Sequence, residues 1–254
     1  MTYSICASSL YLGQPLPEAF RRISALGFDT CEIWQWHRDG LEAVASAAEK
    51  YGLKLIAACA TQVPLTDPAR HQEYMEALRE DLRAARRMGC EFLLAQVGPE
   101  LPDVPRAEQH AAIVAGLRAC APLLEEAGVT LAVEPLNRLV DHKGYYLTSS
   151  LEGLEIVREV ASPRVKLVFD VYHQQVSEGN LLENLRACLP EVVHIHIAGN
   201  PGRHEPWIDS EVHYPTIIRA ARAAGYTGRI GLEYIPLLDP DESLREAMRQ
   251  LPQE

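Results

Sequence analysis

Three carboxylates and one imidazole stand at the ends of four consecutive apolar segments. Three of the segments end on an acid, and these are Leu131–Glu134, Leu167–Asp170 and Ile230–Glu233. The fourth, Val193–Gly199, alternates histidine with aliphatic residues, as a strand with one polar face would. Three hard oxygen donors and one nitrogen at one rim suit a divalent cation. The predicted metal ligands are Glu134, Asp170, His196 and Glu233.

Each of these acids also has a simpler interpretation when it is taken alone. A carboxylate at the end of a strand can cap the next helix or form a salt bridge. Three ionised carboxylates that converge in an apolar rim, however, would repel one another unless a cation compensated their charge. The donor set favours Mn²⁺, Mg²⁺ or Co²⁺, and Zn²⁺ is possible but less favoured because thiolates and several imidazoles are missing.

Other polar residues near these segments are candidates for substrate contacts. His173 follows Asp170 by three residues, and it could be a second ligand, a hydrogen-bond donor to substrate or a solvent-facing residue at a helix entry. His194 lies one layer below His196, so we expect it to support His196 rather than to bind the metal. Arg203 and His204 form a loop cluster suited to an anionic substrate group, with a solvated loop as the alternative.

Residues after the second and fourth apolar segments are less well defined. Trp34, Trp36 and His37 could line an apolar side of the pocket or pack under a helix. Glu32 and Gln96 could reach the interior, but alternation alone does not decide which face they occupy.

Eight apolar segments rich in β-forming residues alternate with helical patterns along the chain. Their spacing is that of a βα unit rather than of a short solenoid repeat. The predicted strands are Tyr3–Cys6, Thr30–Trp34, Lys54–Cys59, Phe92–Val97, Thr130–Glu134, Val165–Asp170, Val193–Ala198 and Arg229–Tyr234.

The intervening segments carry helix signals. An amphipathic stripe predicts a helix over Arg70–Met88, and Gly89 follows it as a stop signal. Ser149 and Glu152 form a capping box at the start of another helix. Asp239, followed by proline and two acids, marks the start of the last helix.

Eight strand–helix units predict an α/β fold, a (β/α)8 TIM barrel that forms a single domain over residues 1–254. An open doubly wound sheet is the alternative, but its Gly-x-Gly-x-x-Gly fingerprint is absent. In such barrels the functional residues lie at the C-terminal ends of the strands. Small or apolar residues stand two positions before each acid, and these are Ala132, Val168 and Gly231.

Composition limits the class of protein. The net charge of −11 argues against nucleic acid as a partner, because phosphates need a basic surface. The six cysteines occur singly, without a Cys-x-x-Cys pair, and we expect buried thiols in a reducing cytoplasm. Neither a secretory signal nor an apolar run that could span a bilayer is visible. A homo-oligomer is possible, but no interface can be identified.

Several motifs resemble the xylose-isomerase-like barrel superfamily and, within it, the hydroxypyruvate isomerase family. The resemblance runs from about Leu131 to Pro236 and is weak before that. The motifs are Glu134-Pro135-Leu136-Asn137, Phe169-Asp170-Val171-Tyr172-His173, His196-Ile197-Ala198-Gly199, Arg203-His204-Glu205-Pro206 and Leu232-Glu233-Tyr234.

The resemblance implies a TIM barrel that binds one divalent metal through the four predicted ligands. It also implies that Glu134 and Glu233 transfer the protons, with His173 and Arg203 near the substrate. One position departs from the family pattern. Hydroxypyruvate isomerases often carry Gln where this chain has His196, whereas the related ketose epimerases have His.

The expected activity is a metal-dependent isomerisation of a small hydroxy-carbonyl acid, such as hydroxypyruvate to tartronate semialdehyde, through a cis-enediolate. The nearest alternative is a C3 epimerase of free ketoses. An abasic-site endonuclease would need further histidines at the ends of the third and fourth strands, where the chain has Cys59-Ala60-Thr61-Gln62 and Gln96-Val97-Gly98. A barrel that binds sugar or metal without turnover is the non-enzymatic alternative.

Overall fold

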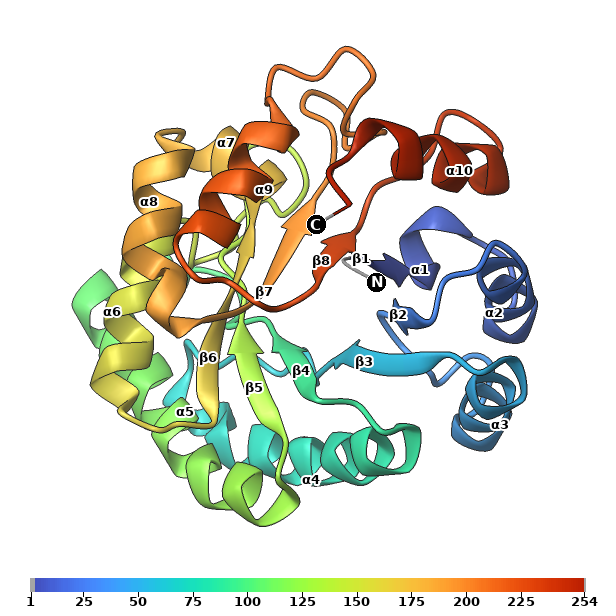
Figure 1. The fold of residues 1–254 in the computed structure, drawn as a ribbon. Coiled ribbons are helices and arrows are strands. Elements are labelled where there is room, and N and C mark those ends of the chain that lie inside the picture. The colour runs from blue at the N-terminus through green and yellow to red at the C-terminus, as the bar shows by residue number, and fades with distance from the viewer. Residues whose placement is uncertain (1–2, 254) are drawn as a thin grey trace.

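Eight parallel strands close into a barrel surrounded by helices in the computed structural model, which describes residues 3–253 (Figure 1). Each strand pairs with its neighbours in sequence, and β1 pairs with β8 to complete the barrel. The predicted TIM barrel is therefore confirmed. The predicted limits of the domain include residues 1, 2 and 254, which lie outside the described residues. The strands are β1 (Tyr3–Cys6), β2 (Thr30–Glu32), β3 (Lys54–Cys59), β4 (Phe92–Ala95), β5 (Thr130–Val133), β6 (Val165–Asp170), β7 (Val192–Ile197) and β8 (Ile230–Leu232).

The helices follow the strands and form the outer layer of the barrel. Two helices follow β6 where a single helix would suffice for a βα unit. None of the helices between residues 3 and 253 combines the length and apolar content needed to cross a bilayer. The helices are α1 (Ala7–Leu10), α2 (Leu16–Ala25), α3 (Leu41–Tyr51), α4 (His71–Met88), α5 (Arg106–Ala127), α6 (Ser150–Val160), α7 (Val171–Ser177), α8 (Leu181–Cys188), α9 (Tyr214–Ala223) and α10 (Pro240–Gln250), with short 3₁₀ turns at Pro68–Arg70 and Leu189–Glu191.

The predicted helix signals have the expected local structure. Ser149 accepts a hydrogen bond from the backbone N–H of Glu152 at the start of α6 (3.4 Å). Asp239 accepts from the N–H groups of Asp241 and Glu242 at the start of α10. Gly89 ends α4 with φ +77°, a left-handed conformation that favours glycine. These caps satisfy backbone groups that helix ends leave without partners.

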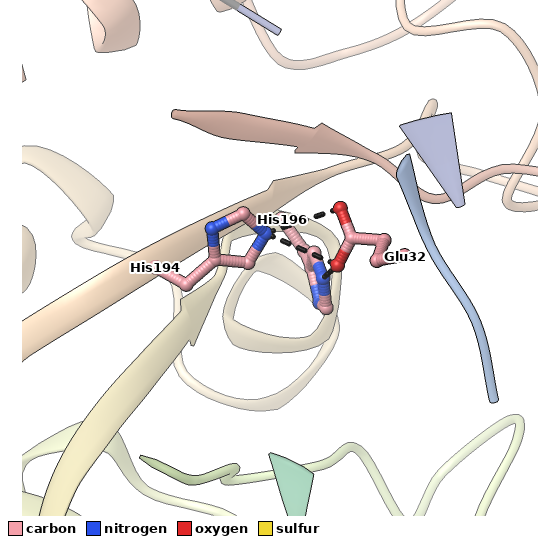
Figure 2. Close-up of side chains that lie close together, drawn as sticks. All are labelled: Glu32, His194 and His196. Atoms are coloured by element: carbon pink, nitrogen blue, oxygen red, sulfur yellow. Dashed lines mark hydrogen bonds and ion pairs between the residues drawn. The ribbon is translucent and has the colours of Figure 1, made fainter. Parts of the chain in front are cut away.

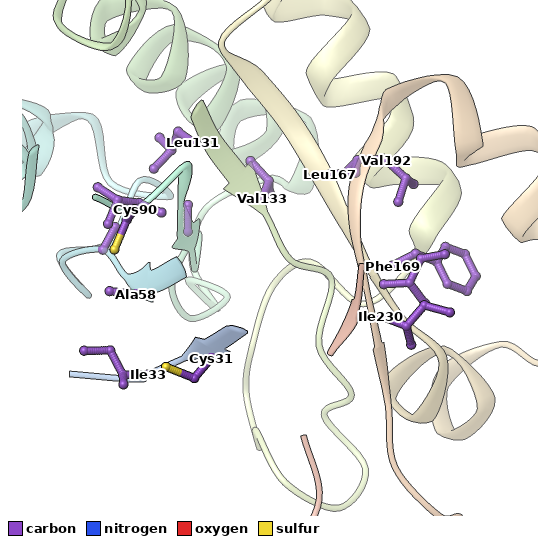
Figure 3. Close-up of a cluster of buried hydrophobic side chains, with 14 of the residues drawn as sticks. Cys31, Ile33, Ala58, Cys90, Leu131, Val133, Leu167, Phe169, Val192 and Ile230 are labelled. Atoms are coloured by element: carbon purple, nitrogen blue, oxygen red, sulfur yellow. The ribbon is translucent and has the colours of Figure 1, made fainter. Parts of the chain in front are cut away.

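Two apolar layers hold the barrel together. The larger layer lies between the strands and the helices, and it includes the outward-facing side chains of Leu131, Val133 and Leu167 (Figure 3). A smaller buried cluster contains Ala132 and Val168. Because side chains alternate along a strand, the residues that follow on this second face are Glu134 and Asp170. Glu134 and Asp170 therefore lie on the same face of the sheet as this smaller cluster.

The C-terminal ends of the strands change from regular pairing to single contacts. Five strands end one or two residues before the predicted position, and these are β2, β4, β5, β7 and β8. Beyond their ends single backbone hydrogen bonds remain, such as the one from Glu134 N to Ala95 O (3.0 Å) and the one from Glu233 N to Ile197 O (3.2 Å). Glu134 and Glu233 thus stand at the first positions after their strands, and Asp170 is the last residue of β6.

Asp81 on α4 gives the fold a pH-dependent contact. Its side chain is 7% exposed and accepts a hydrogen bond from the backbone N–H of Thr61, after β3 (2.7 Å). Burial raises the pKa of Asp81 to about 6, although the Thr61 N–H opposes the change. The folded state therefore binds this proton more tightly than the unfolded state, and the associated stability is lost as the pH rises through 6.

We predict that Asp81→Asn is more stable than wild type at pH 8 and that the advantage disappears near pH 4. The amide is neutral and still accepts from Thr61, so the gain at pH 8 is about 3 kcal/mol, from a pKa difference of about two units. Urea unfolding between pH 4 and 8 measures it. Asp67→Asn, at a carboxylate that caps Ala69 near the surface, is the control. A stability difference for Asp81→Asn that does not vary with pH would contradict the prediction.

Candidate metal centre

The four predicted ligands meet at the mouth of the barrel. Glu134 follows β5, Asp170 ends β6, His196 lies in β7 and Glu233 follows β8. Each offers one nitrogen or oxygen atom, and these atoms all lie within 4.8 Å of one another. All four side chains are buried, with at most 5% of any residue exposed. Residues from Glu134 to Glu233, up to 99 positions apart in the sequence, therefore form one compact donor set.

The imidazole of His196 directs its Nδ1 atom toward both glutamates. Its Nδ1 atom is 3.1 Å from Glu134 Oε1 and 3.5 Å from Glu233 Oε2. Its Nε2 atom faces the opposite direction and lies 2.8 Å from Glu32 Oε2. Burial lowers the pKa of His196, but the charges of Glu233 and Glu32 outweigh this effect and raise it well above its usual range.

The two glutamates occupy different electrostatic environments. Burial raises the pKa of Glu134, and the hydrogen bond with His196 offsets this only in part. Burial also disfavours the charged form of Glu233, but His196, Arg203 and the Trp34 N–H outweigh it and lower the pKa to about 2. The surroundings therefore shift the pKa values of the two carboxyl groups in opposite directions.

Asp170 and His173 leave two polar atoms without partners. Asp170 Oδ1 accepts from the His173 backbone N–H (2.9 Å), which caps α7. Asp170 Oδ2 and His173 Nε2 lie 3.7 Å apart, and both are buried without a hydrogen bond among the described residues. A buried carboxylate oxygen without a donor is costly unless something binds it. The orphaned oxygen and the oxygen-rich donor set both fit a divalent cation.

His173 is fixed by Asn137, in the loop after β5. Asn137 Nδ2 lies 2.7 Å from His173 Nδ1, and the Asn137 backbone N–H donates to the same atom (3.3 Å). Burial lowers the pKa of His173 well below its usual range, and the nearby charge of Arg203 adds to the effect. A neutral ring that accepts at Nδ1 carries its proton on Nε2, so His173 presents a donor to the site.

Arg203 brings positive charge to the carboxylates. Its Nη2 donates to Glu233 Oε2 (2.6 Å) and lies 3.9 Å from Asp170 Oδ2. The guanidinium also lies over the ring of Tyr172, 5.4 Å from its centre. Arg203 belongs to the loop after β7. Glu205 in the same loop is buried, and its carboxylate accepts hydrogen bonds from the backbone N–H groups of Leu237 and Leu238, which hold the loop in place.

A cavity of about 470 Å³ opens above the donor set. Its floor contains Glu134 and Glu233, and its walls include residues from the loops after β1 to β5 and after β7. Among the predicted substrate contacts, His173 and Arg203 line this cavity, and so do Trp34 and Gln96. The volume is typical of a small-molecule site.

Three of the candidate pocket residues lie elsewhere. His204 is not among the residues that line the cavity, and its Nδ1 lies 2.8 Å from the backbone oxygen of Ile235. Trp36 stacks on His37, with ring centres 3.8 Å apart, and neither residue lines the cavity. Loops carry no periodic pattern from which these orientations could be predicted.

Two contacts to the donor set were not predicted from the sequence. Trp34 Nε1 donates a hydrogen bond to Glu233 Oε1 (2.6 Å). The Glu32 carboxylate lies within hydrogen-bond distance of the His194 and His196 rings (Figure 2). A signal for Glu32 is visible in hindsight. Its apolar neighbours Cys31 and Ile33 pack in the outer layer of the core, so Glu32 must face the barrel axis.

The family model described as "Xylose isomerase-like TIM barrel" matches residues 20–253 of the chain. The chain belongs to this family. A human protein named "Putative hydroxypyruvate isomerase" is 30% identical over 244 residues, which cover 90% of this chain and 87% of that protein. A 2-oxo-tetronate isomerase of Cupriavidus necator is 33% identical over 169 residues, covering 66% of this chain and 64% of that protein.

Solved structures share the fold of this xylose isomerase-like barrel. The crystal structure of an AP endonuclease, family 2, from Brucella melitensis superposes with a TM-score of 0.91 at 24% identity, covering 98% of this chain and 99% of that one. At this level of identity the likeness shows the fold alone. At the ends of β3 and β4 the present chain places Cys59 and Gln96 beside the cavity, and not the histidines expected of an abasic-site endonuclease.

We predict that Asp170→Asn weakens Mn²⁺ binding about 100-fold or more, which corresponds to about 2.7 kcal/mol. The amide can still cap α7, but it removes the charge of the orphaned oxygen. In scanning calorimetry, Mn²⁺ should raise the unfolding temperature of wild type and have little effect on the variant. Glu91→Gln, an exposed carboxylate paired with Lys54, is the control. An equal Mn²⁺-dependent increase in Asp170→Asn would contradict the assignment.

Proposed function

We propose that this protein is a divalent-metal-dependent isomerase of a small 2-keto acid that carries a hydroxyl group on the neighbouring carbon, such as hydroxypyruvate. The observation that carries the proposal is that Glu134 and Glu233 both lie close to His196 Nδ1 and both line the cavity. The names of the human and Cupriavidus relatives support the same reaction class.

The proton transfers fall to the two glutamates. A divalent cation held by the four ligands would act as a Lewis acid toward the carbonyl oxygen and the adjacent hydroxyl of the substrate. Glu233, ionised by its surroundings, suits removal of the proton from the hydroxyl-bearing carbon. Glu134, whose pKa is raised, suits delivery of a proton to the former carbonyl carbon.

The atoms of this reaction balance within one substrate. Loss of a C3 proton from hydroxypyruvate gives a cis-enediolate over C2 and C3. Protonation at C2, with transfer of the hydroxyl proton from O3 to O2, gives tartronate semialdehyde. No oxidant or reductant is needed, because the oxidation states of C2 and C3 exchange.

Arg203 and His173 are suited to orient the substrate. Arg203 is the cationic side chain nearest to the glutamates, and its planar guanidinium matches a substrate carboxylate. His173 Nε2 has no partner among the residues that the structure describes, so it is free to donate to a substrate oxygen. Trp34 restrains Glu233 through its indole N–H, which keeps the carboxylate facing the cavity.

His196 favours a second candidate, a C3 epimerase of free ketoses. The related epimerases carry histidine at this position, as the sequence resemblance implies. An epimerase would use the same acids but return the proton to the opposite face of the carbon that lost it. The two reactions therefore differ in where solvent hydrogen enters the product.

We predict that hydroxypyruvate incubated in D₂O with Mn²⁺ and the protein gains deuterium at C2 of the aldehyde product. NMR locates the label. An epimerase would instead label only the carbon that changes configuration in a ketose. Deuterium confined to that carbon, with hydroxypyruvate left unlabelled, would contradict the isomerase and favour the epimerase.

We also predict that Glu233→Gln and Glu134→Gln each lower kcat by about 10²–10⁴, the usual contribution of general acid–base catalysis. Mn²⁺ affinity must be measured alongside kcat, since both residues are proposed ligands, and assays at saturating Mn²⁺ separate the two effects. Asp67→Asn controls for a change from carboxylate to amide on the surface. Near wild-type turnover in either variant would exclude that residue from the proton transfer.

A further inference from the structure

A buried carboxylate lies beneath the four proposed ligands, on the side of His196 that faces away from the cavity. Glu32, at the end of β2, is 1% exposed. Its Oε2 lies 2.8 Å from His196 Nε2, and its Oε1 lies 3.2 Å from His194 Nε2. Ser4 Oγ donates to Oε1 as well (2.7 Å). Figure 2 shows both imidazole rings turned toward this one carboxylate.

The contacts around Glu32 limit which of its partners can donate hydrogen bonds and which can accept them. Three polar atoms surround the two carboxylate oxygens, and a carboxyl group has at most one proton to donate. At least two of the three partners must therefore donate, and an ionised carboxylate accepts from all of them. The closest nitrogen is His196 Nε2. When Nε2 carries the proton of a neutral imidazole, the lone pair is on Nδ1, the atom that faces Glu134 and Glu233.

The neighbouring strand leaves room for this arrangement. Gly231 on β8 pairs with His196 on β7 and with Ser4 on β1. A Cβ atom on Gly231 would lie 2.5 Å from Glu32 Oε1, 2.5 Å from His196 Cδ2 and 2.6 Å from His194 Nε2. These distances are shorter than any van der Waals contact. Only glycine at this position lets the carboxylate and both imidazoles pack against one another.

We propose that Glu32 is the positioning residue of the metal centre, which holds His196 in the tautomer and orientation that present Nδ1 to the cation. His194 and Ser4 hold Glu32 in turn. The inference rests on the proposed function, because it requires that the four ligands bind a metal. Partners of this kind, which form a hydrogen bond with a metal ligand, typically change metal affinity by 10- to 100-fold when they are removed.

The test is Glu32→Gln, with Mn²⁺ alone as the probe and no substrate. The glutamine amide can donate to His196 as well as accept from it, so it no longer requires a proton on Nε2. Electron paramagnetic resonance titration of the metal-free protein should show a dissociation constant 10- to 100-fold higher than that of wild type. Nitrogen-15 NMR of the Zn²⁺-loaded proteins should show the Nε2–H form of His196 in wild type and a changed ring signal in the variant.

Two further variants complete the experiment. Asp81→Asn also neutralises a buried carboxylate, but away from the donor set, and it should bind Mn²⁺ as wild type does. Ser4→Ala removes a single hydrogen bond from Glu32, and it should weaken Mn²⁺ binding by a smaller factor than Glu32→Gln. If Glu32→Gln does not fold, Ser4→Ala decides the question.

The outcomes separate this inference from the proposed function. Equal Mn²⁺ affinity and an unchanged His196 tautomer in Glu32→Gln, while wild type binds Mn²⁺, would overturn the role of Glu32 and leave the metal centre intact. Wild-type affinity in Ser4→Ala would do the same if it is the variant that folds. Absence of Mn²⁺ binding in wild type would overturn both the inference and the proposed function.

Discussion

The barrel concentrates negative charge in a place that water scarcely reaches. Glu32, Glu134, Asp170 and Glu233 are all buried around one imidazole, and Arg203 is the only side chain with a permanent positive charge that the structure describes beside them. Such a cluster is costly unless further positive charge compensates it. The donor geometry and the orphaned oxygen of Asp170 indicate where that charge would bind. The contacts of Arg203 with Glu233 and Asp170 supply part of the positive charge that the cluster requires.

Much of the fold could be predicted from the sequence because it depends on local patterns. Apolar segments rich in β-forming residues predicted every strand, and β1, β3 and β6 have the predicted bounds. The predicted ends of the strands were less accurate, because single backbone hydrogen bonds continue past the last paired residue. The division of the segment after β6 into α7 and α8 was not predicted. Gly179 and Asn180 separate these helices, both with positive φ, in a short segment without a strong apolar stripe.

The candidate site was predictable where strands determine it and unpredictable where loops do. The four proposed ligands lie on or directly after strands, so alternation placed them together. The Trp34–Glu233 hydrogen bond joins residues 199 positions apart, through a loop with no periodic pattern. His204 turns to the backbone of Ile235 for the same reason, while its neighbour Arg203 faces the carboxylates. Alternation assigns Glu32 to the barrel interior only once both its neighbours, Cys31 and Ile33, are known to be buried in the outer layer of the core.

Anomalous diffraction from crystals soaked in Mn²⁺ tests the central claim most directly. The account predicts one strong peak at the mouth of the barrel, bound by oxygens of Glu134, Asp170 and Glu233 and by Nδ1 of His196, with Nε2 still hydrogen-bonded to Glu32. A peak at another place, or no peak while Arg203 remains on Glu233 and Asp170, would contradict it.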